Sequence, residues 1–255
     1  MTNYLILFAA VLILANVAFV ISIVRKRNDV ADIAWGLGFV AVAWLSYCLT
    51  DSANSRGILV NILVTVWGLR LALNIFLRQR GHGEDFRYKA WRESWGKWFL
   101  VRSYFQVYIL QGMLLFLIST PVIWANFRVA EFQIFDLIGL TLFLIGFFFE
   151  AVGDYQLTAF KKKEENKGRI IQTGLWKFTR HPNYFGEVVL WWGIFFFALS
   201  LPLGYVSISS PVLVTILLLF VSGIPMLEKK YENDPEFIEY KKRTSAFFPM
   251  PVKRG

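Results

Sequence analysis

The sequence predicts an all-α, polytopic integral membrane protein with about seven transmembrane helices, and three observations lead to this prediction. Of its 255 residues, 56% are hydrophobic, and the mean hydropathy of +0.49 is unusual for a soluble domain of this length. The apolar residues gather in segments near the roughly 20 residues that a helix needs to cross a bilayer. Basic residues gather in alternate connections between these segments. We expect one transmembrane domain over residues 1–255, without an internal repeat.

Seven apolar segments are the predicted spans. They cover residues 3–24, 30–49, 58–77, 103–124, 135–155, 184–201 and 211–227. The last two are short, so we expect them to pack inside the bundle. The first segment has neither a basic region before it nor a small-residue cleavage site, which favours a retained span over a signal peptide.

The positive charge predicts the orientation of these spans. Four connections are basic, namely residues 25–27, 78–102, 161–180 and 229–254, whereas the opposite side has only Arg56 and Arg128 in its short loops. The positive-inside rule then places the N-terminus outside and the C-terminus in the cytoplasm. The net charge of +9 is thus explained by topology and anionic lipid, and we expect no nucleic-acid partner.

Two cytoplasmic segments are predicted to form helices at the membrane surface. Within residues 84–100, Trp91, Trp95 and Trp98 follow helical spacing, which is typical of an interfacial aromatic belt. A further short helix is expected from Pro235 to Tyr240, because proline favours the first helical turn.

Five charged residues fall within the predicted spans, all in the cytoplasmic half: Asp32, Arg70, Glu150, Asp154 and Glu187. Because lipid tolerates such groups only where protein or water receives them, they indicate one polar cavity open to the cytoplasm. Helical spacing aligns Trp67, Arg70, Asn74 and Arg78 in one stripe, and Gln111 adds an amide in the fourth span. The alternative is that Arg70 only pairs with Glu150 or Asp154 to hold the bundle.

The junction at residues 180–187 (RHPNYFGE) is the strongest candidate for a small-molecule site. A basic turn leads through a proline into an apolar helix that carries an acid one turn inside. We expect no protein-bound metal, because the chain has one cysteine, Cys48, and two histidines, His82 and His181. Gly36, Gly38 and Ala41 match a dinucleotide fingerprint, but their place inside a span indicates close helix packing instead.

These residues resemble a known family. Residues 180–187 resemble the R-H-x-N-Y-x-G-[DE] signature of membrane sterol and steroid reductases, and the tail from Glu228 through Tyr240 and Arg243 to Pro249 is similar as well. Residues 67–71, residues 78–88 and residues 153–162 resemble the bacterial branch described as steroid 5α-reductase-like. The similarity covers nearly the whole chain and implies an integral protein of a bacterial inner membrane.

The resemblance implies an oxidoreductase in which NADPH enters from the cytoplasm and reduces an activated C=C bond of a steroid or another lipid. It assigns the phosphates to a basic rim and the ribose and carboxamide groups to polar side chains near the junction. The implied cofactor-binding residues are Arg70, Asn74, Arg78, Arg80, Arg87, Asp154, Lys161, Arg169, Arg180, His181, Asn183, Tyr184, Glu187, Tyr240 and Arg243.

The expected substrate end differs from that of the animal steroid reductases. Their second span carries a Gln-Glu pair and their third a tyrosine, whereas this chain has Asp32 and Trp67 in those regions. Asp32 is the first candidate for the proton donor and Tyr184 the second. Trp35, Trp67, Gln111 and Glu150 are the expected substrate contacts, and the substrate is a steroid or other lipid enone.

Two other functions stay open. The R-H-P turn also occurs in isoprenylcysteine and phospholipid methyltransferases, so an S-adenosylmethionine-dependent methyltransferase is the alternative enzyme. The third hypothesis is a non-enzymatic lipid-binding or scaffold protein. In each case the expected partners are membrane lipids, and no obligate protein partner is inferred.

Overall fold

Helices and connecting turns make up the part of the chain that the structure describes, residues 2–50, 54–81 and 83–252 of a computed structural model. Outside the helices, an isolated parallel β-bridge joins Thr179 to Ser245. The all-α prediction is confirmed. His82, one of the two histidines counted above, lies outside the described residues.

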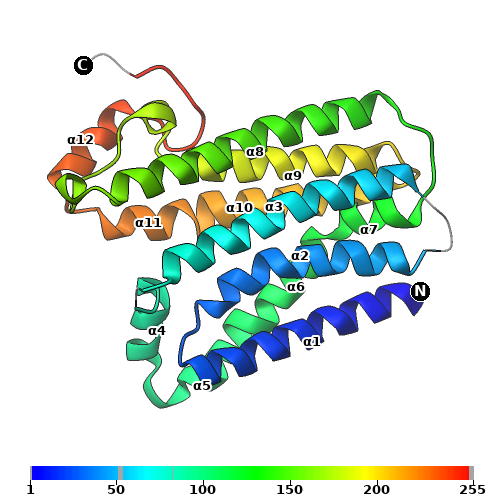
Figure 1. The fold of residues 1–255 in the computed structure, drawn as a ribbon, viewed down its shortest axis with the longest axis horizontal. Coiled ribbons are helices and arrows are strands. Elements are labelled where there is room, and N and C mark those ends of the chain that lie inside the picture. Colours follow the sequence, from blue (N-terminus) through cyan, green and yellow to red (C-terminus); the bar gives the residue numbers. More distant parts are fainter. Residues whose placement is uncertain (1, 51–53, 82, 253–255) are drawn as a thin grey trace. The chain divides into compact units, whose positions relative to one another are not determined.

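The chain forms two compact units. Unit 1 comprises Met1–Phe132 and Leu201–Ser207, and unit 2 comprises Gln133–Ser200 and Ile208–Gly255. The helices of unit 1 are α1 (Thr2–Arg25), α2 (Val30–Cys48), α3 (Ser55–Gln79), α4 (Phe86–Trp95), η1 (Gly96–Trp98), α5 (Phe99–Ser103), the π-helical η2 (Tyr104–Ile109), α6 (Leu110–Ile118) and α7 (Thr120–Phe127) (Figure 1). Those of unit 2 are α8 (Ile134–Lys161), η3 (Glu164–Asn166), η4 (Gly174–Lys177), α9 (Pro182–Leu199), α10 (Ser209–Ile216), the π-helical η6 (Leu217–Val221), α11 (Ile224–Lys230) and α12 (Pro235–Arg243). The short helix η5 (Gly204–Ile208), which precedes α10, belongs to unit 1 except for its last residue.

Six helical stretches of the described chain are long and apolar enough to cross a membrane. They are Thr2–Arg25, Val30–Cys48, Ser55–Gln79, Phe86–Ile118, Ile134–Lys161 and Gly204–Lys230. The protein is therefore a polytopic membrane protein, although the predicted count of seven is not confirmed. The predicted sixth span corresponds to α9, which is not among these six stretches and has Asn183 and Glu187 in its first two turns.

The fourth predicted span differs most from the observed helices. The predicted surface helix at residues 84–100 and the start of this span join in one helical stretch, Phe86–Ile118. Gly96, inside the predicted surface helix, takes a φ of 49° and ends α4. The end of the predicted span is a separate helix, α7, which has Pro121 in its first turn. The predicted C-terminal helix is confirmed as α12, where the Asp234 side chain accepts from the backbone N–H of Glu236 at 2.8 Å.

Glycines allow the closest helix contacts in each unit. In unit 2, α8 and α9 lie side by side (Figure 1), and a Cβ at Gly146 would stand 2.5 Å from the carbonyl oxygen of Gly186. In unit 1, a Cβ at Gly36 would stand 2.6 Å from the carbonyl oxygen of Gly68 on α3. The interpretation of Gly36 as a packing residue, rather than part of a dinucleotide fingerprint, is confirmed.

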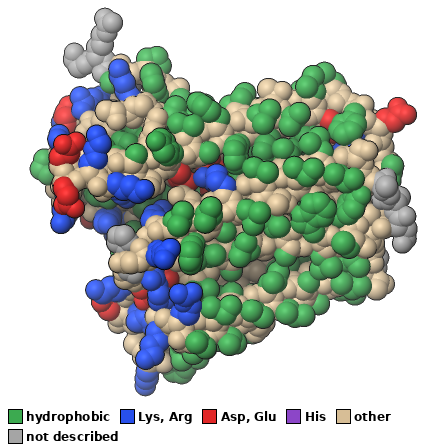
Figure 2. Space-filling model, viewed as in Figure 1, with side chains coloured by type: hydrophobic (Ala, Val, Ile, Leu, Met, Phe, Trp, Pro, Cys, Tyr) green, Lys and Arg blue, Asp and Glu red, His purple; other side chains and the backbone are tan. Residues whose placement is uncertain are grey.

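The surface is divided by side-chain type within each unit. On the face shown in Figure 2, hydrophobic side chains cover the long helices, while Lys and Arg side chains gather around α12 in unit 2 and around α4 in unit 1. Exposed apolar side chains on long helices are the expected surface of a protein in lipid.

Candidate functional site

The turn before α9 is built around Arg180, whose side chain is only 6% exposed. Its guanidinium contacts Glu228 of α11, with an Nη2–Oε1 distance of 2.8 Å. It also donates to the backbone carbonyls of Lys241 and Thr244. Arg180, which was predicted to bind the cofactor, thus uses its guanidinium for contacts within the chain. These contacts tie the turn to α11 and to the end of α12.

His181 follows in the same turn and shares the Glu228 carboxylate. Its Nε2 lies 3.1 Å from Oε1 of Glu228, and its ring stacks on Tyr184 with centroids 5.5 Å apart. Burial lowers the pKa of His181, against the opposing effect of Glu228. The neutral ring then donates from Nε2 to the carboxylate, which leaves Nδ1 as an acceptor.

The chain after α12 covers this turn. The backbone N–H of Arg180 donates to the carbonyl of Ser245 at 2.8 Å, and that of Met250 donates to Phe178 at 2.9 Å. The Tyr240 hydroxyl, a predicted cofactor contact, donates to the carbonyl of Trp176, and burial raises its pKa. Residues 244–250 therefore form a strap that fixes the junction from one side.

Asp154 and Asn183 meet where α8 passes the first turn of α9. The amide Nδ2 of Asn183 donates to Oδ1 of Asp154 at 3.2 Å. The amide Oδ1 is buried and accepts no hydrogen bond from the residues that the structure describes. A buried acceptor of this kind has a place for one donor from a ligand or water. Close approach is possible because the neighbouring residue on α8 is Gly153, where a Cβ would lie 3.2 Å from the Asn183 backbone nitrogen.

Two further acids of unit 2 lie along the same pair of helices. Glu150 is 2% exposed, and its backbone nitrogen is among the atoms that a Cβ on Gly186 would meet. Glu187 is half-buried on α9. Glu150 therefore lies on α8 and Glu187 on α9, the two helices that pack against each other in unit 2.

Three cationic side chains of unit 2 remain at its surface: Lys161, Arg169 and Arg243. Arg243 donates to the side-chain oxygen of Gln172 at 2.6 Å, and Gln172 in turn donates to Glu236 at 3.0 Å. The long loop between α8 and α9 is thereby attached to α12.

In unit 1, Asp32 lies in the first turn of α2 and is engaged by two side chains of α4. Arg87 Nη2 contacts its Oδ2 at 2.6 Å, and the Tyr88 hydroxyl donates to its Oδ1 at 2.7 Å. Arg87 also pairs with Asp85, the residue that caps α4, at 2.9 Å. Burial alone would raise the pKa of Asp85, but the hydrogen bond and charge of Arg87 lower it.

The predicted stripe on α3, from Trp67 to Arg78, passes from a buried apolar environment to the exposed end of the helix. Trp67 is fully buried, with its ring 5.4 Å from that of Phe39 on α2. Arg70 and Asn74 are half-buried, whereas Arg78 and Arg80 are exposed at the end of the helix. Of the five charged residues expected in one cavity, Asp32 and Arg70 belong to unit 1, and the three acids Glu150, Asp154 and Glu187 belong to unit 2.

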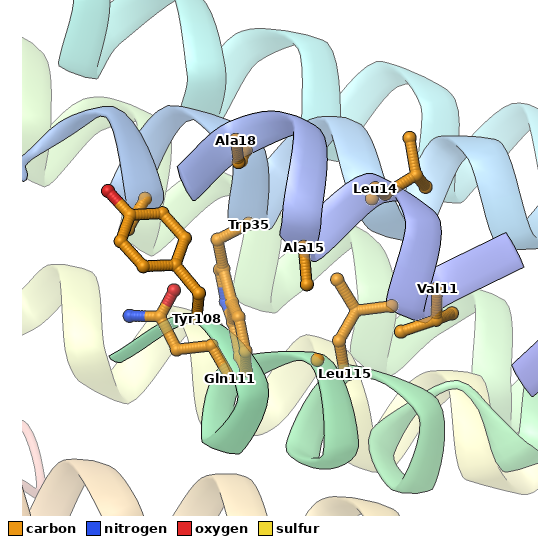
Figure 3. A pocket seen from close by; sticks show the side chains of 12 residues that line it. Val11, Leu14, Ala15, Ala18, Trp35, Tyr108, Gln111 and Leu115 are labelled. Atoms are coloured by element: carbon orange, nitrogen blue, oxygen red, sulfur yellow. The ribbon is translucent and has the colours of Figure 1, made fainter. Parts of the chain in front are cut away.

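Two predicted substrate contacts come together in unit 1. Trp35 and Gln111 line the same groove, together with apolar residues of α1, α2 and α6 (Figure 3). Trp67 does not line this groove, although its neighbour Phe39 also contacts Trp35, with ring centroids 5.1 Å apart.

Sequence reasoning missed the roles of Glu228 and Tyr88. Glu228 receives Arg180, His181 and Lys241 within 3.4 Å, and Tyr88 is 2% exposed beside Asp32. A signal for Tyr88 was present, because the Asp85 cap places Arg87 and Tyr88 in the first turn of α4. Arg180 and His181 precede Glu228 by 48 and 47 positions in the chain, so no local sequence pattern identifies these contacts.

The fold defines a class, the polytopic helical membrane proteins. Each unit of this protein also contains a cluster of ion pairs, around Arg180 and Glu228 in unit 2 and around Arg87 and Asp32 in unit 1. Within this class, the chain belongs to the family described as "Protein of unknown function (DUF1295)", which matches residues 18–244. It is 26% identical, over 265 aligned positions, to the "Uncharacterized protein C594.04c" of Schizosaccharomyces pombe, covering 93% of this chain and 77% of that protein. No solved structure matches the chain.

Proposed function

We propose that the protein is an NADPH-dependent oxidoreductase that reduces an activated C=C bond of a steroid or other lipid enone. The observation that carries the proposal is the amide of Asn183, which is fixed by Asp154 through Nδ2 while its buried Oδ1 lacks a partner in the described chain. Family membership over residues 18–244 agrees with the resemblance on which the proposal builds. The cofactor would enter from the cytoplasm, on the side where the basic connections lie.

The side chains of unit 2 suit the parts of such a cofactor. The Asn183 oxygen would accept from a carboxamide N–H or a ribose hydroxyl, and Asp154 offers a carboxylate acceptor beside it. Exposed Lys161, Arg169 and Arg243 supply positive charge for phosphates, a function that Arg180 is less able to take because its donors are engaged. When bound, NADPH would supply the hydride for the double bond.

The chain's own residues would position the ligand and deliver a proton. Arg180 and the 244–250 strap hold the turn that carries Asn183 and Tyr184. Asp32 and Tyr184 are the two proton-donor candidates, and Asp32 contacts Arg87 at 2.6 Å and accepts from the Tyr88 hydroxyl at 2.7 Å. The Tyr184 ring stacked on His181 would also present an aromatic face to a planar ring.

Ligand-dependent thermal unfolding of the detergent-purified full-length protein tests this function. NADPH should raise the unfolding midpoint, since a ligand at about 100 times its Kd stabilises by about 2.7 kcal/mol. Asn183→Leu should lose most of this shift. The matched control is Asn166→Leu, because the Asn166 side chain lies in the loop after α8 and donates to the carbonyl of Phe160, at the end of that helix, at 2.9 Å.

The outcomes separate the candidate functions. A shift with S-adenosylmethionine and none with NADPH would replace the reductase by the methyltransferase. No shift with either, or an equal loss in both asparagine variants, would contradict a nucleotide site at Asn183.

A further inference from the structure

A groove in unit 1 has one polar and one apolar end. It has a volume of about 40 Å³ and lies between α1, α2 and α6. Figure 3 shows Tyr108, Gln111 and Trp35 together at one end, and Val11, Leu14 and Leu115 at the other. Ala15 and Gly112 make the wall between them shallow. Since all three helices belong to membrane-spanning stretches, an occupant can arrive from the lipid.

The polar end offers hydrogen-bonding groups that the described chain does not use. Tyr108 donates to the carbonyl of Asn28 at 3.2 Å. By contrast, neither the side-chain amide of Gln111 nor the indole N–H of Trp35 has a hydrogen bond with any described residue. An amide placed in hydrocarbon without a partner costs a few kcal/mol, whereas a leucine there costs nothing. The pair is therefore explained best by a ligand that accepts hydrogen bonds.

The size of the groove limits the shape of that ligand. Pockets that enclose compact, drug-sized molecules measure about 300 Å³ or more. A groove of about 40 Å³ takes a carbonyl group and a few methylenes in single file, but not a fused ring system. Nε2 of Gln111 and Nε1 of Trp35 are both donors, so a carbonyl oxygen is a group that the two side chains can bind together.

We propose that this groove binds the carbonyl end of a straight-chain lipid, with the oxygen at Gln111 and Trp35 and the chain along Ala15 and Gly112. The binding of this lipid does not depend on the proposed reductase function, whereas its reduction by NADPH does. Under that function the substrate is a straight-chain enone or enal. Hydride adds to its β-carbon and a proton to its α-carbon, so that the enone, NADPH and a proton give the saturated carbonyl compound and NADP⁺.

Photolabelling of the full-length protein in phosphatidylcholine nanodiscs tests the binding. The probes are a diazirine-bearing straight-chain hexadecyl methyl ketone and a diazirine-bearing 3-oxo sterol of similar hydrophobicity. The chain ketone should label peptides of α1 and α6 in preference to the sterol. Gln111→Leu should weaken its binding about tenfold, the equivalent of one hydrogen bond of about 1.4 kcal/mol.

Two variants serve as controls. Gln106→Leu removes the same side chain five positions earlier, at an exposed site outside the groove, and should leave labelling unchanged. Gly112→Ala should weaken labelling without unfolding, because the added Cβ would stand 3.4 Å from that of Ala15, an ordinary contact that narrows the groove.

The results separate this inference from the proposed function. Equal labelling of wild type and Gln111→Leu, or stronger labelling of the groove by the sterol, would overturn the inference. Groove labelling without NADPH-dependent reduction of the matching enone would support the binding site and contradict the reductase. NADPH-dependent reduction of the enone with labelling outside the groove would support the reductase and contradict the binding site.

Discussion

The two buried ion-pair clusters use arginine differently. In unit 2, Arg180 and Glu228 are 6% and 11% exposed, and the same guanidinium also satisfies two backbone carbonyls. In unit 1, Arg87 and Asp32 are 24% and 15% exposed, and Arg87 divides its donors between two carboxylates. The more conspicuous arginine of the sequence thus holds the chain together, while the buried Oδ1 of Asn183, three positions later, accepts no hydrogen bond from the described residues. A basic residue within a motif is not necessarily the residue that meets the substrate.

Removing each arginine should give the largest difference between the two clusters. Arg180→Ala leaves Glu228 without its strongest partner in a buried site, and we expect a loss of about 3–5 kcal/mol in unfolding free energy. Arg87→Ala leaves partly exposed carboxylates and should cost about 1–3 kcal/mol. Chemical denaturation in mild detergent measures both, and a larger loss for Arg87→Ala would contradict the comparison.

Adding a methyl group at the glycine contacts should affect both units alike. In Gly146→Ala and Gly36→Ala the new Cβ would stand 2.5 Å and 2.6 Å from a backbone oxygen that cannot move aside alone. We expect each variant to lose about 1–3 kcal/mol of stability. Gly83→Ala is the control, since a Cβ there meets nothing within 4 Å. If all three variants unfold at the same temperature, the close packing described for both units is wrong.

Acid should weaken unit 2 before unit 1. Because the pKa of His181 is lowered in the fold, the unfolded chain binds the extra proton first, and stability is lost as the pH falls below about 6.5. Asp85 has a lowered pKa, so its contribution is present above about 3.9 and is lost only below that pH. The loss at His181 is at most about 1.4 kcal/mol per pH unit.

Hydrogen exchange between pH 7 and pH 4.5 resolves the two units by their peptides. After correction for the slower intrinsic exchange of amides in acid, peptides around residues 179–187 should show lower protection factors at pH 5 than at pH 7, and those around residues 84–88 should not. His181→Gln should remove the difference. Lower protection around residues 84–88 alone would contradict the assignment.

Much of the fold could be predicted because hydropathy and helix signals are local. The apolar segments gave the spans, and Pro235 and Gly36 gave a helix start and a packing contact that the structure confirms. The helix end at Gly96 and the polar residues at the start of α9 were not predicted from hydropathy. A single glycine or asparagine changes the mean hydropathy of a long apolar window only slightly.

The candidate site was less predictable, because its contacts join distant parts of the chain. Of the residues predicted to share a site, Asp154 contacts Asn183, and Trp35 lines the same groove as Gln111. The engagement of Arg180 by Glu228, Lys241 and Thr244 depends on the C-terminal segment folding back, which no local pattern in the sequence encodes.

The most direct test of the nucleotide site is hydrogen exchange of the full-length protein in nanodiscs, with and without NADPH. We predict slower exchange in peptides that contain Asp154 and the first turn of α9, at NADPH concentrations that also raise the unfolding midpoint, and no such change with S-adenosylmethionine. Unchanged exchange in both segments under saturating NADPH, or protection by S-adenosylmethionine alone, would contradict the proposed function.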